Sequence, residues 1–432
     1  MINASALQGV IGLAIFIALA TAISQNRQQI SWRLVLSAIA MQFVICAAFI
    51  HFSFLQQILA SLNEGVQALS HASVKGTSFV FGFLGGGEAP FEVKSPNLMV
   101  TLAFQILPMI IVISALSALL WYWRVLPLLV KAISGFFEHT LNTHGPAGLV
   151  AVINIFLGQV ESALMVKPYL AKMSKHDLLL VMTAGMAMIA GSMMVIYAAM
   201  LGPELGPDLG GILGHLITKS MMSVPASILF AHLLVPEDRT DKVHPESESS
   251  SENKTQVEQP YKSMMDAITR GTSEGLSIYL NVVAILIVLS ALVALGNDGL
   301  AWVGAHFGYP SLSIQGIVGG LFAPVAWLMG VPWEQASMAG ALLGVKTVLN
   351  EFLAYLDLIK LPDSALDTHT RLIMIYALCG FANLGSIGIQ ISGLSAMIPE
   401  RRDELNSLAW PSFIAAILAS CMTGAIVGLV IP

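Results

Sequence analysis

Long apolar runs that carry almost no charge most strongly limit what this chain can fold into. The 432 residues are 56% hydrophobic and 11% charged, whereas soluble chains carry about 25% charged residues. A helix needs about 20 consecutive apolar residues to cross the ~30 Å hydrocarbon layer of a membrane. We therefore predict an all-α membrane protein with eight transmembrane helices, at 3–24, 32–51, 98–123, 177–201, 212–235, 276–296, 370–396 and 409–431.

Charge and cysteine content exclude several other classes of protein. The formal net charge of −6 and the absence of a basic patch argue against nucleic-acid binding. The three cysteines, Cys46, Cys379 and Cys421, each lie in an apolar run without metal-binding spacing, which indicates packing residues. The sequence contains no HExxH, CxxC or P-loop pattern, so we expect neither an enzyme nor a cofactor.

The first apolar run resembles a signal peptide because Ala20-Thr21-Ala22 has the composition of a cleavage site. No basic residue precedes the run, however, and the first one, Arg27, follows it. We therefore expect a retained spanning helix.

Three apolar segments are too polar or too interrupted to span a membrane in the ordinary way. Residues 53–73 place apolar side chains at helical spacing among polar ones, which predicts a helix lying in the interface. The segments at about 145–172 and 311–360 are broken by Gly, Pro and polar residues. Irregular backbone survives at membrane depth only where protein or a cavity surrounds it, so we predict two re-entrant hairpins.

The distribution of basic residues predicts the orientation of the chain. Arg27 and Arg33 lie between the first two spans, and Arg401 and Arg402 lie between the last two, whereas 202–211 has acids and no Lys or Arg. Because loops rich in Lys and Arg stay in the cytoplasm, both termini are expected outside it.

A charged linker at 236–262 divides the chain into two similar halves. The linker has almost no apolar residues, which predicts a disordered cytoplasmic segment. Each half has a long span, a broken hairpin and two further spans, and the halves enter the membrane from opposite sides, as in the inverted repeats of secondary transporters. The expected domains are 1–75, 97–235 with the first hairpin, the linker, and 263–432 with the second hairpin.

Polar residues inside the first hairpin are candidates for solute binding. Within the apolar stretch 154–161, Gly158 allows a turn, Gln159 offers a donor and an acceptor, and Glu161 accepts protons from hydroxyl or amide groups. A carboxylate at this depth costs about 2.5–3.5 kcal/mol on insertion scales. The alternative is a buried Glu161 satisfied by neighbouring backbone.

The second hairpin places Glu351 in the equivalent position. Two acids, one from each half, would suit a neutral ligand that carries many hydroxyl groups. Alternatively, Lys346, one turn earlier, neutralises Glu351. A further lysine, Lys219, is expected to extend to the membrane interface.

A span that is interrupted by small and polar residues follows each hairpin. The interruptions lie at 189–193, with Gly191 and Ser192, and at 381–386, with Asn383 and Ser386. Broken helices of this kind expose backbone dipoles that bind solutes and ions, whereas small residues alone also allow close helix packing.

The order of these motifs resembles the concentrative nucleoside transporter family, in its eight-span bacterial form, over nearly the whole chain. The motifs are Thr77-Ser-Phe-Val-Phe-Gly82, Asn154 to Glu161, Gly330-Val-Pro-Trp333, Leu349-Asn-Glu-Phe352 and Cys379-Gly-Phe-Ala-Asn383. The resemblance implies a homotrimer in the bacterial inner membrane, with both termini periplasmic and one nucleoside path in each protomer.

The resemblance also implies which residues contact the nucleoside. Gln159, Glu161 and Met193 would face the base, with Val160 beside it where many members carry Thr or Ser. The preference for purine or pyrimidine therefore stays open. The ribose would be held by Glu351, Asn383 and Ser386, with Phe381 nearby.

Sodium-coupled members of the family bind the ion between the first hairpin and the next span. The corresponding residues here are Asn154, Leu157, Met188 and Ile189. Met188 stands where those members have a Ser, and its thioether is a poor ligand for a hard cation that prefers oxygen. Proton coupling through Glu161 or Glu351 is therefore an equal rival to sodium coupling.

The resulting prediction is a nucleoside symporter that works by alternating access with sodium ions or protons. One alternative is an intramembrane enzyme that uses Glu161 and Glu351 as an acid–base pair, although no nucleophile or metal site accompanies them. Another is a passive nucleoside facilitator, which differs only in coupling.

Overall fold

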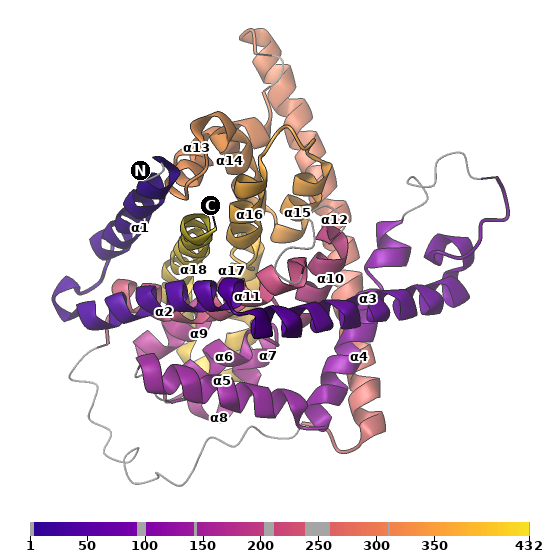
Figure 1. The fold of residues 1–432 in the computed structure, drawn as a ribbon, viewed down its shortest axis with the longest axis horizontal. Helices are drawn as coiled ribbons and strands as arrows, with labels where there is room; N and C mark the ends of the chain where they lie inside the picture. Colours follow the sequence, from indigo (N-terminus) through magenta and orange to yellow (C-terminus); the bar gives the residue numbers. More distant parts are fainter. Residues whose placement is uncertain are drawn as a thin grey trace.

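The computed structural model describes residues 4–92, 101–141, 145–202, 211–237, 260–309 and 312–431. The elements assigned within these ranges are all helices, joined by turns and short loops (Figure 1). Most of the predicted linker at 236–262 and of the turn at 202–211 lies outside the described residues, as do the first residues of the span at 98–123.

Three helices begin the chain. Helix α1 (Ala4–Ala22) leads into α2 (Trp32–His51) and α3 (Ser53–Phe81), and α2 and α3 run almost in line across the molecule (Figure 1). The apolar–polar spacing predicted a helix over 53–73, and the structure extends it to a 29-residue helix.

The part of the chain that precedes the predicted linker continues with a succession of short and longer helices. Helix α5 was not predicted as a separate element, although its buried residues Leu126, Val130, Phe137 and Leu141 follow helical spacing. The elements are η4 (Leu102–Ile106), α4 (Met109–Tyr122), α5 (Val125–Leu141), α6 (Pro146–Ile153), α7 (Glu161–Leu164), α8 (Lys167–Leu170), α9 (Lys175–Ala187), α10 (Gly191–Leu201) and α11 (Ile212–Leu234).

The second half begins with α12, whose 43 residues extend well beyond the predicted span at 276–296. Helices α13 and α14 follow and are bent by 117° relative to each other at their connection. The elements are α12 (Met264–His306), α13 (Ile314–Leu328), α14 (Trp333–Val348), α15 (Glu351–Lys360), α16 (Thr368–Leu378), α17 (Leu384–Met397) and α18 (Arg402–Val430).

Several helices are long and apolar enough to cross a membrane. Among the described residues, 6 helices meet this condition, or 7 if the bent pair α13 and α14 counts as one span. Helices α1 and α17 are apolar but shorter. Their positions coincide with predicted spans, so the chain is a multi-pass membrane protein, whereas the count of eight stays a prediction.

The core lies where the helices of the two halves meet. Helix α18 packs on α9, α11 and α16, and nearly every residue of α11 is buried. Helices that are apolar all round can be surrounded by protein in this way. The interruptions between α9 and α10 and between α16 and α17 lie inside this core.

Candidate functional site

Backbone hydrogen bonds join three interruptions of the helical structure. Helix α9 ends at Ala187, and Met188 has an extended backbone, with φ −112° and ψ 173°. The amide of Gly191 donates to the carbonyl of Phe156 in the first hairpin at 3.0 Å, and the amide of Phe381 donates to the carbonyl of Met188 at 3.2 Å. The first hairpin and both broken spans therefore meet at one place.

The carboxylate of Glu351 lies at the centre of this region and is 4% exposed. The hydroxyl of Tyr197, in α10, donates to one carboxylate oxygen at 2.8 Å. The side-chain amide of Asn383 donates to the other at 3.3 Å. Donors from both halves of the chain thus hold one buried acid.

Asn383 has a structural role as well as a contact with Glu351. It caps the N-terminus of α17, where its side-chain oxygen accepts the backbone amide of Ser386 at 2.9 Å. Asn350 caps α15 in the same way, accepting the amide of Leu353 at 2.9 Å. The two caps fix the backbone on either side of the acid.

Two buried amide side chains meet beside Gly185 of α9. A Cβ on Gly185 would lie 2.5 Å from Nε2 of Gln390 and 2.9 Å from Cβ of Gln159. The Nε2 atom of Gln390 donates to the carbonyl of Met182 at 3.0 Å. The Oε1 atoms of both glutamines are buried without a hydrogen-bond partner. Such atoms call for a reason, and they leave two acceptors available to a ligand.

The remaining predicted base-side residues take different positions. Val160 packs on α17, where a Cβ at Gly393 would lie 2.7 Å from its Cγ2 atom. Met193 is 6% exposed within α10. Phe381 is half-buried at the second break, and Ser386 is buried in the first turn of α17.

Glu161 differs from Glu351 in its surroundings. It is the first residue of α7 and is exposed. Its carboxylate folds back over Gly158, where even a Cβ would clash with it, and it interacts electrostatically with Glu274 of α12. The reading of Glu161 as a buried, backbone-satisfied acid is wrong. The hypothesis that both acids hold one solute stays a prediction.

The predicted sodium ligands already make contacts within the protein. The Oδ1 atom of Asn154 accepts the hydroxyl of Ser162 at 2.8 Å, and its Nδ2 atom donates to the carbonyl of Val150 at 3.1 Å. The carbonyl of Met188 accepts the amide of Phe381. Leu157 is half-buried, and Ile189 is fully buried at the break between α9 and α10, and their role as sodium ligands stays a prediction.

Two lysines are buried near these breaks, and for one of them the prediction was wrong. Lys219 is 0% exposed, and its Nζ atom donates to the carbonyl of Ala187, so it does not extend to the interface. Lys346 is 2% exposed and donates to the carbonyl of Ala377 at 2.8 Å. Lys346 also interacts electrostatically with Glu351, and neutralisation of that acid by Lys346 stays a prediction.

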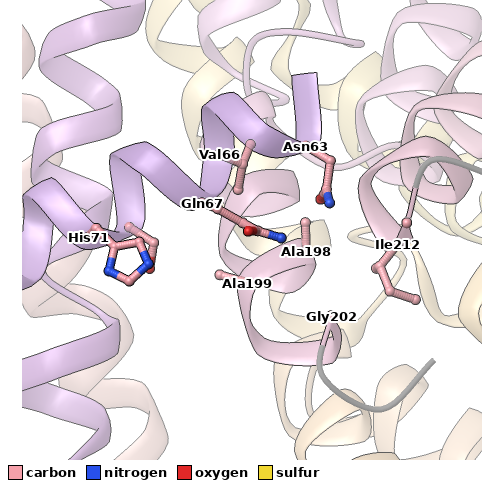
Figure 2. A pocket seen from close by; sticks show the side chains of 10 residues that line it. Asn63, Val66, Gln67, His71, Ala198, Ala199, Gly202 and Ile212 are labelled. Atoms are coloured by element: carbon pink, nitrogen blue, oxygen red, sulfur yellow. The ribbon is translucent and has the colours of Figure 1, made fainter. Parts of the chain in front are cut away.

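A separate cavity of about 280 Å³ lies beside α3 and the end of α10. Figure 2 shows Asn63, Gln67 and His71 of α3 on one side of it and Ala198 and Ala199 of α10 on the other. The predicted site residues are not among those that line it. This cavity is therefore distinct from the cluster around Glu351.

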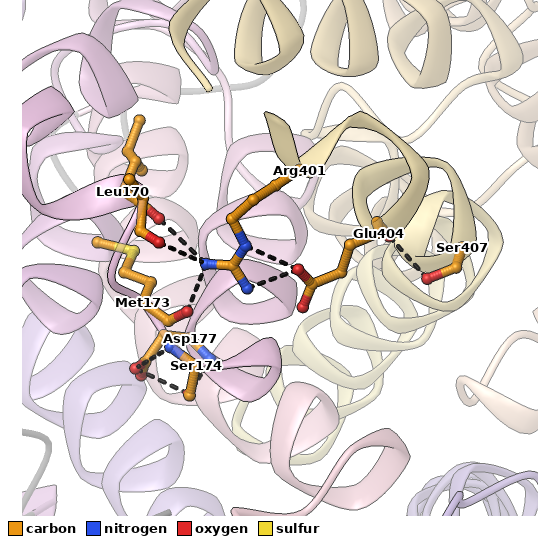
Figure 3. Close-up of polar contacts among 8 residues, drawn as sticks. Leu170, Met173, Ser174, Asp177, Arg401, Glu404 and Ser407 are labelled. Atoms are coloured by element: carbon orange, nitrogen blue, oxygen red, sulfur yellow. Dashed lines mark hydrogen bonds and ion pairs between the residues drawn. The ribbon is translucent and has the colours of Figure 1, made fainter. Parts of the chain in front are cut away.

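Arg401 fastens the second half of the chain to the first hairpin. Figure 3 shows its guanidinium between Glu404 and backbone carbonyls of the hairpin. It pairs with the Glu404 carboxylate at 2.6 Å and donates to the carbonyls of Leu170 and Ala171 at 3.3 Å each, and to that of Met173. Arg401 thereby ties residues 170–173 of the predicted hairpin to the start of α18.

The sequence of this chain matches three known family descriptions. Its sequence matches the Na⁺ dependent nucleoside transporter N-terminus over residues 11–84 and the Na⁺ dependent nucleoside transporter C-terminus over residues 215–428. Between them, residues 103–204 match the family described as nucleoside recognition. The chain belongs to the concentrative nucleoside transporter family.

Relatives of this transporter include bacterial nucleoside permeases and a human solute carrier. It is 33% identical to the nucleoside permease NupC of Helicobacter pylori, covering 99% of this chain and 98% of that one. It is 35% identical to the putative nucleoside permease NupX of Escherichia coli, covering 98% and 99%. It is 32% identical to human solute carrier family 28 member 3, covering 97% of this chain and 59% of the human one.

Solved structures of the family have the same fold. CNTnw in an inward-facing substrate-bound state superposes with a TM-score of 0.87 at 36% identity, covering 99% of this chain and 98% of that one. The resemblance inferred from the motifs is confirmed. The prediction that the chain is not an enzyme is confirmed as well, because its relatives and structural neighbours are transporters.

Three polar residues of this region were not predicted from the sequence, and a fourth was placed wrongly. Tyr197, Ser162 and Gln390 were not singled out, and Lys219 was placed at the interface. Each lies in an apolar run, where a polar residue is costly unless it is paired. That cost was a usable signal, but the partners come from distant parts of the chain.

Proposed function

We propose that this transporter imports nucleosides by symport with a cation, either sodium or a proton, through alternating access. The arrangement of Glu351 supports the proposal most strongly. Its carboxylate is held by Tyr197 of the first half and Asn383 of the second. A solute that exchanges hydrogen bonds with this cluster contacts both halves, and their relative movement can then depend on the solute.

The chemistry of the cluster fits a nucleoside. Carboxylate and amide groups at Glu351 and Asn383, with Ser386 nearby, suit the paired hydroxyls of a ribose. The unpaired Oε1 atom of Gln159 and the carboxylate of Glu161 offer acceptors for the N–H groups of the base. Val160 and Met193 supply apolar contact with the base. Phe381 supplies apolar contact near the ribose. A nucleoside that lacks a ribose hydroxyl would leave buried groups unpaired and would bind much more weakly.

The wider organisation that goes with this function is also proposed. We expect eight spans, re-entrant hairpins at about 145–172 and 311–360, and inverted repeats at 97–235 and 263–432. The protein would be a homotrimer in the bacterial inner membrane with both termini periplasmic. The element order of the two halves and the 117° bend between α13 and α14 support this organisation.

Uptake by the purified protein in proteoliposomes tests the proposal. Radiolabelled uridine and adenosine are supplied with a sodium gradient alone, a proton gradient alone or neither. We expect saturable uptake that one of the gradients drives to a level above the external concentration. Protein-free liposomes and a gradient-collapsing ionophore are the controls.

The same assay separates the remaining rival function. A passive facilitator would equilibrate the nucleoside without accumulating it, whatever gradient is imposed. Absence of uptake of any nucleoside under either gradient would contradict the proposal as a whole.

A further inference from the structure

Lys219 lies where a broken helix ends in the interior of the protein. Its side chain extends from α11 to the carbonyl of Ala187, the last residue of α9. The C-terminus of a helix carries a partial negative charge of about half an elementary charge. The ammonium group therefore supplies the positive charge that this helix end favours, in a place that water does not reach.

This position adjoins the predicted sodium ligands. Ala187 directly precedes Met188 and Ile189, and in secondary transporters the ends of half-helices and unwound carbonyls hold the coupling cation. Here the neighbouring oxygens are already engaged, since the Asn154 Oδ1 atom accepts Ser162 and the Met188 carbonyl accepts Phe381. The region therefore holds its own cation, and two of the four predicted sodium ligands already have a partner within the protein.

The charges around Lys219 also disfavour a second cation. It interacts electrostatically with Lys346, with Glu351 and with Cys379. When all three groups are ionised, the two lysines and the glutamate carry a net charge of +1. Like charges repel more strongly in the protein interior than in water, so a further cation would bind weakly.

We propose that the ammonium of Lys219 is a resident cation that replaces sodium at the end of α9, so that sodium does not couple to transport in this chain. The inference rests on the proposed transport function and assigns one residue that determines the coupling ion. Lys219 acts here as a positioning residue that satisfies the helix end, without contacting the nucleoside. Of the two coupling ions that the sequence left open, the inference therefore excludes sodium.

Four proteins test the inference: the wild type, Met188→Ser, Lys219→Ser and the double variant of both. Thermal unfolding in detergent is measured with sodium chloride and with choline chloride at equal ionic strength, because a ligand that binds the folded state raises the melting temperature. This readout does not depend on transport. Nucleoside uptake in proteoliposomes under the same two salts is the second readout.

We expect the wild type and Met188→Ser to show no sodium effect, since both keep the ammonium. Lys219→Ser frees the carbonyl and some space, and the double variant adds a hydroxyl ligand. These two should gain a sodium-dependent rise in melting temperature, and the double variant should show uptake stimulated by sodium about fivefold or more, equivalent to about 1 kcal/mol. Lys360→Ser, at an exposed lysine, is the matched control and should behave as wild type.

Three results would overturn the inference. They are sodium stimulation of the wild type, a sodium response in Met188→Ser with Lys219 intact, and no sodium response in a folded double variant. If the Lys219 variants fail to fold, the wild type and Met188→Ser still test the inference through the first two results. Absence of all nucleoside uptake by the wild type would contradict the proposed transport function instead. The melting temperatures distinguish this failure from a failure of the sodium inference, because they do not depend on transport.

Discussion

The hydroxyl of Tyr197 makes the shorter of the two contacts to the Glu351 carboxylate. Hydrogen bonds to charged groups contribute about 1.5–3 kcal/mol, so Tyr197→Phe should lower nucleoside affinity or uptake by about tenfold or more, without loss of fold. Equilibrium nucleoside binding and uptake by the purified variant measure the effect. Tyr309→Phe, at an exposed tyrosine, is the control, and equal activity of the two variants would contradict a role for Tyr197.

Gly185 is needed where the side chains of Gln159 and Gln390 approach α9. In Gly185→Ala the new Cβ would lie 2.5 Å from Nε2 of Gln390, so the amide groups must move, and we expect uptake to fall by about tenfold. Gly135→Ala, in α5 with nothing within 4 Å of its Cβ, should leave uptake unchanged. Full uptake by Gly185→Ala would show that the amide groups do not position the substrate.

Helices α4 and α12 cross at very close range through two glycines of α12. A Cβ at Gly271 would lie 2.8 Å from the Cα of Ala115, and one at Gly275 would lie 2.7 Å from the Cα of Ile111. Spacing of this kind allows helix backbones to approach each other in a membrane. Helices α4 and α12 therefore pack through backbone atoms and small side chains, and a larger side chain at this contact would not fit.

Gly275→Ala should destabilise the protein, because overpacking costs about 1–3 kcal/mol. Gly299→Ala lies in the same helix with nothing within 4 Å, and it should stabilise slightly, because Ala has a helix propensity about 1 kcal/mol better than Gly. Melting temperatures in detergent are expected to move in opposite directions. Equal shifts would contradict the close crossing.

Arg401 is the contact through which the start of α18 holds the first hairpin. In Arg401→Ala the carbonyls of Leu170, Ala171 and Met173 lose their donor, which should cost about 2 kcal/mol. Hydrogen exchange should accelerate over residues 167–173. Arg402→Ala, at the exposed neighbouring arginine, should leave exchange unchanged, and a similar effect from both would indicate a general charge effect.

At the scale of the whole molecule, the predicted orientation of the last two spans can be tested through the cysteine content. The native cysteines Cys46, Cys379 and Cys421 are all buried, so an impermeant maleimide should label the wild type poorly. The exposed residues Ser364 and Ser407 flank the last two predicted spans. In whole spheroplasts, Ser364→Cys should be labelled, whereas Ser407→Cys should need permeabilisation. The reverse labelling pattern would contradict the proposed orientation and indicate the opposite one.

The positions of most helices and of their breaks could be predicted from the sequence, because they depend on residues within each segment. The described helices cover the predicted spans, and both hairpin regions are broken close to where Gly and polar residues interrupt them. Helix α5 was missed because its 17 residues are fewer than the roughly 20 that a spanning helix needs. The extent of α12 was underestimated because its ends are polar although they remain helical.

The sequence by itself determined that this chain is a helical membrane protein and where its helices break, because desolvation of the backbone and of charged groups acts on each segment separately. The order of its motifs also determined the family to which it belongs. Only the tertiary structure decided which polar groups meet. The contacts of Tyr197 with Glu351, at a separation of 154 residues, and of Lys219 with Ala187, at 32, depend on how helices pack. No local pattern encodes the partner that a buried polar group will find.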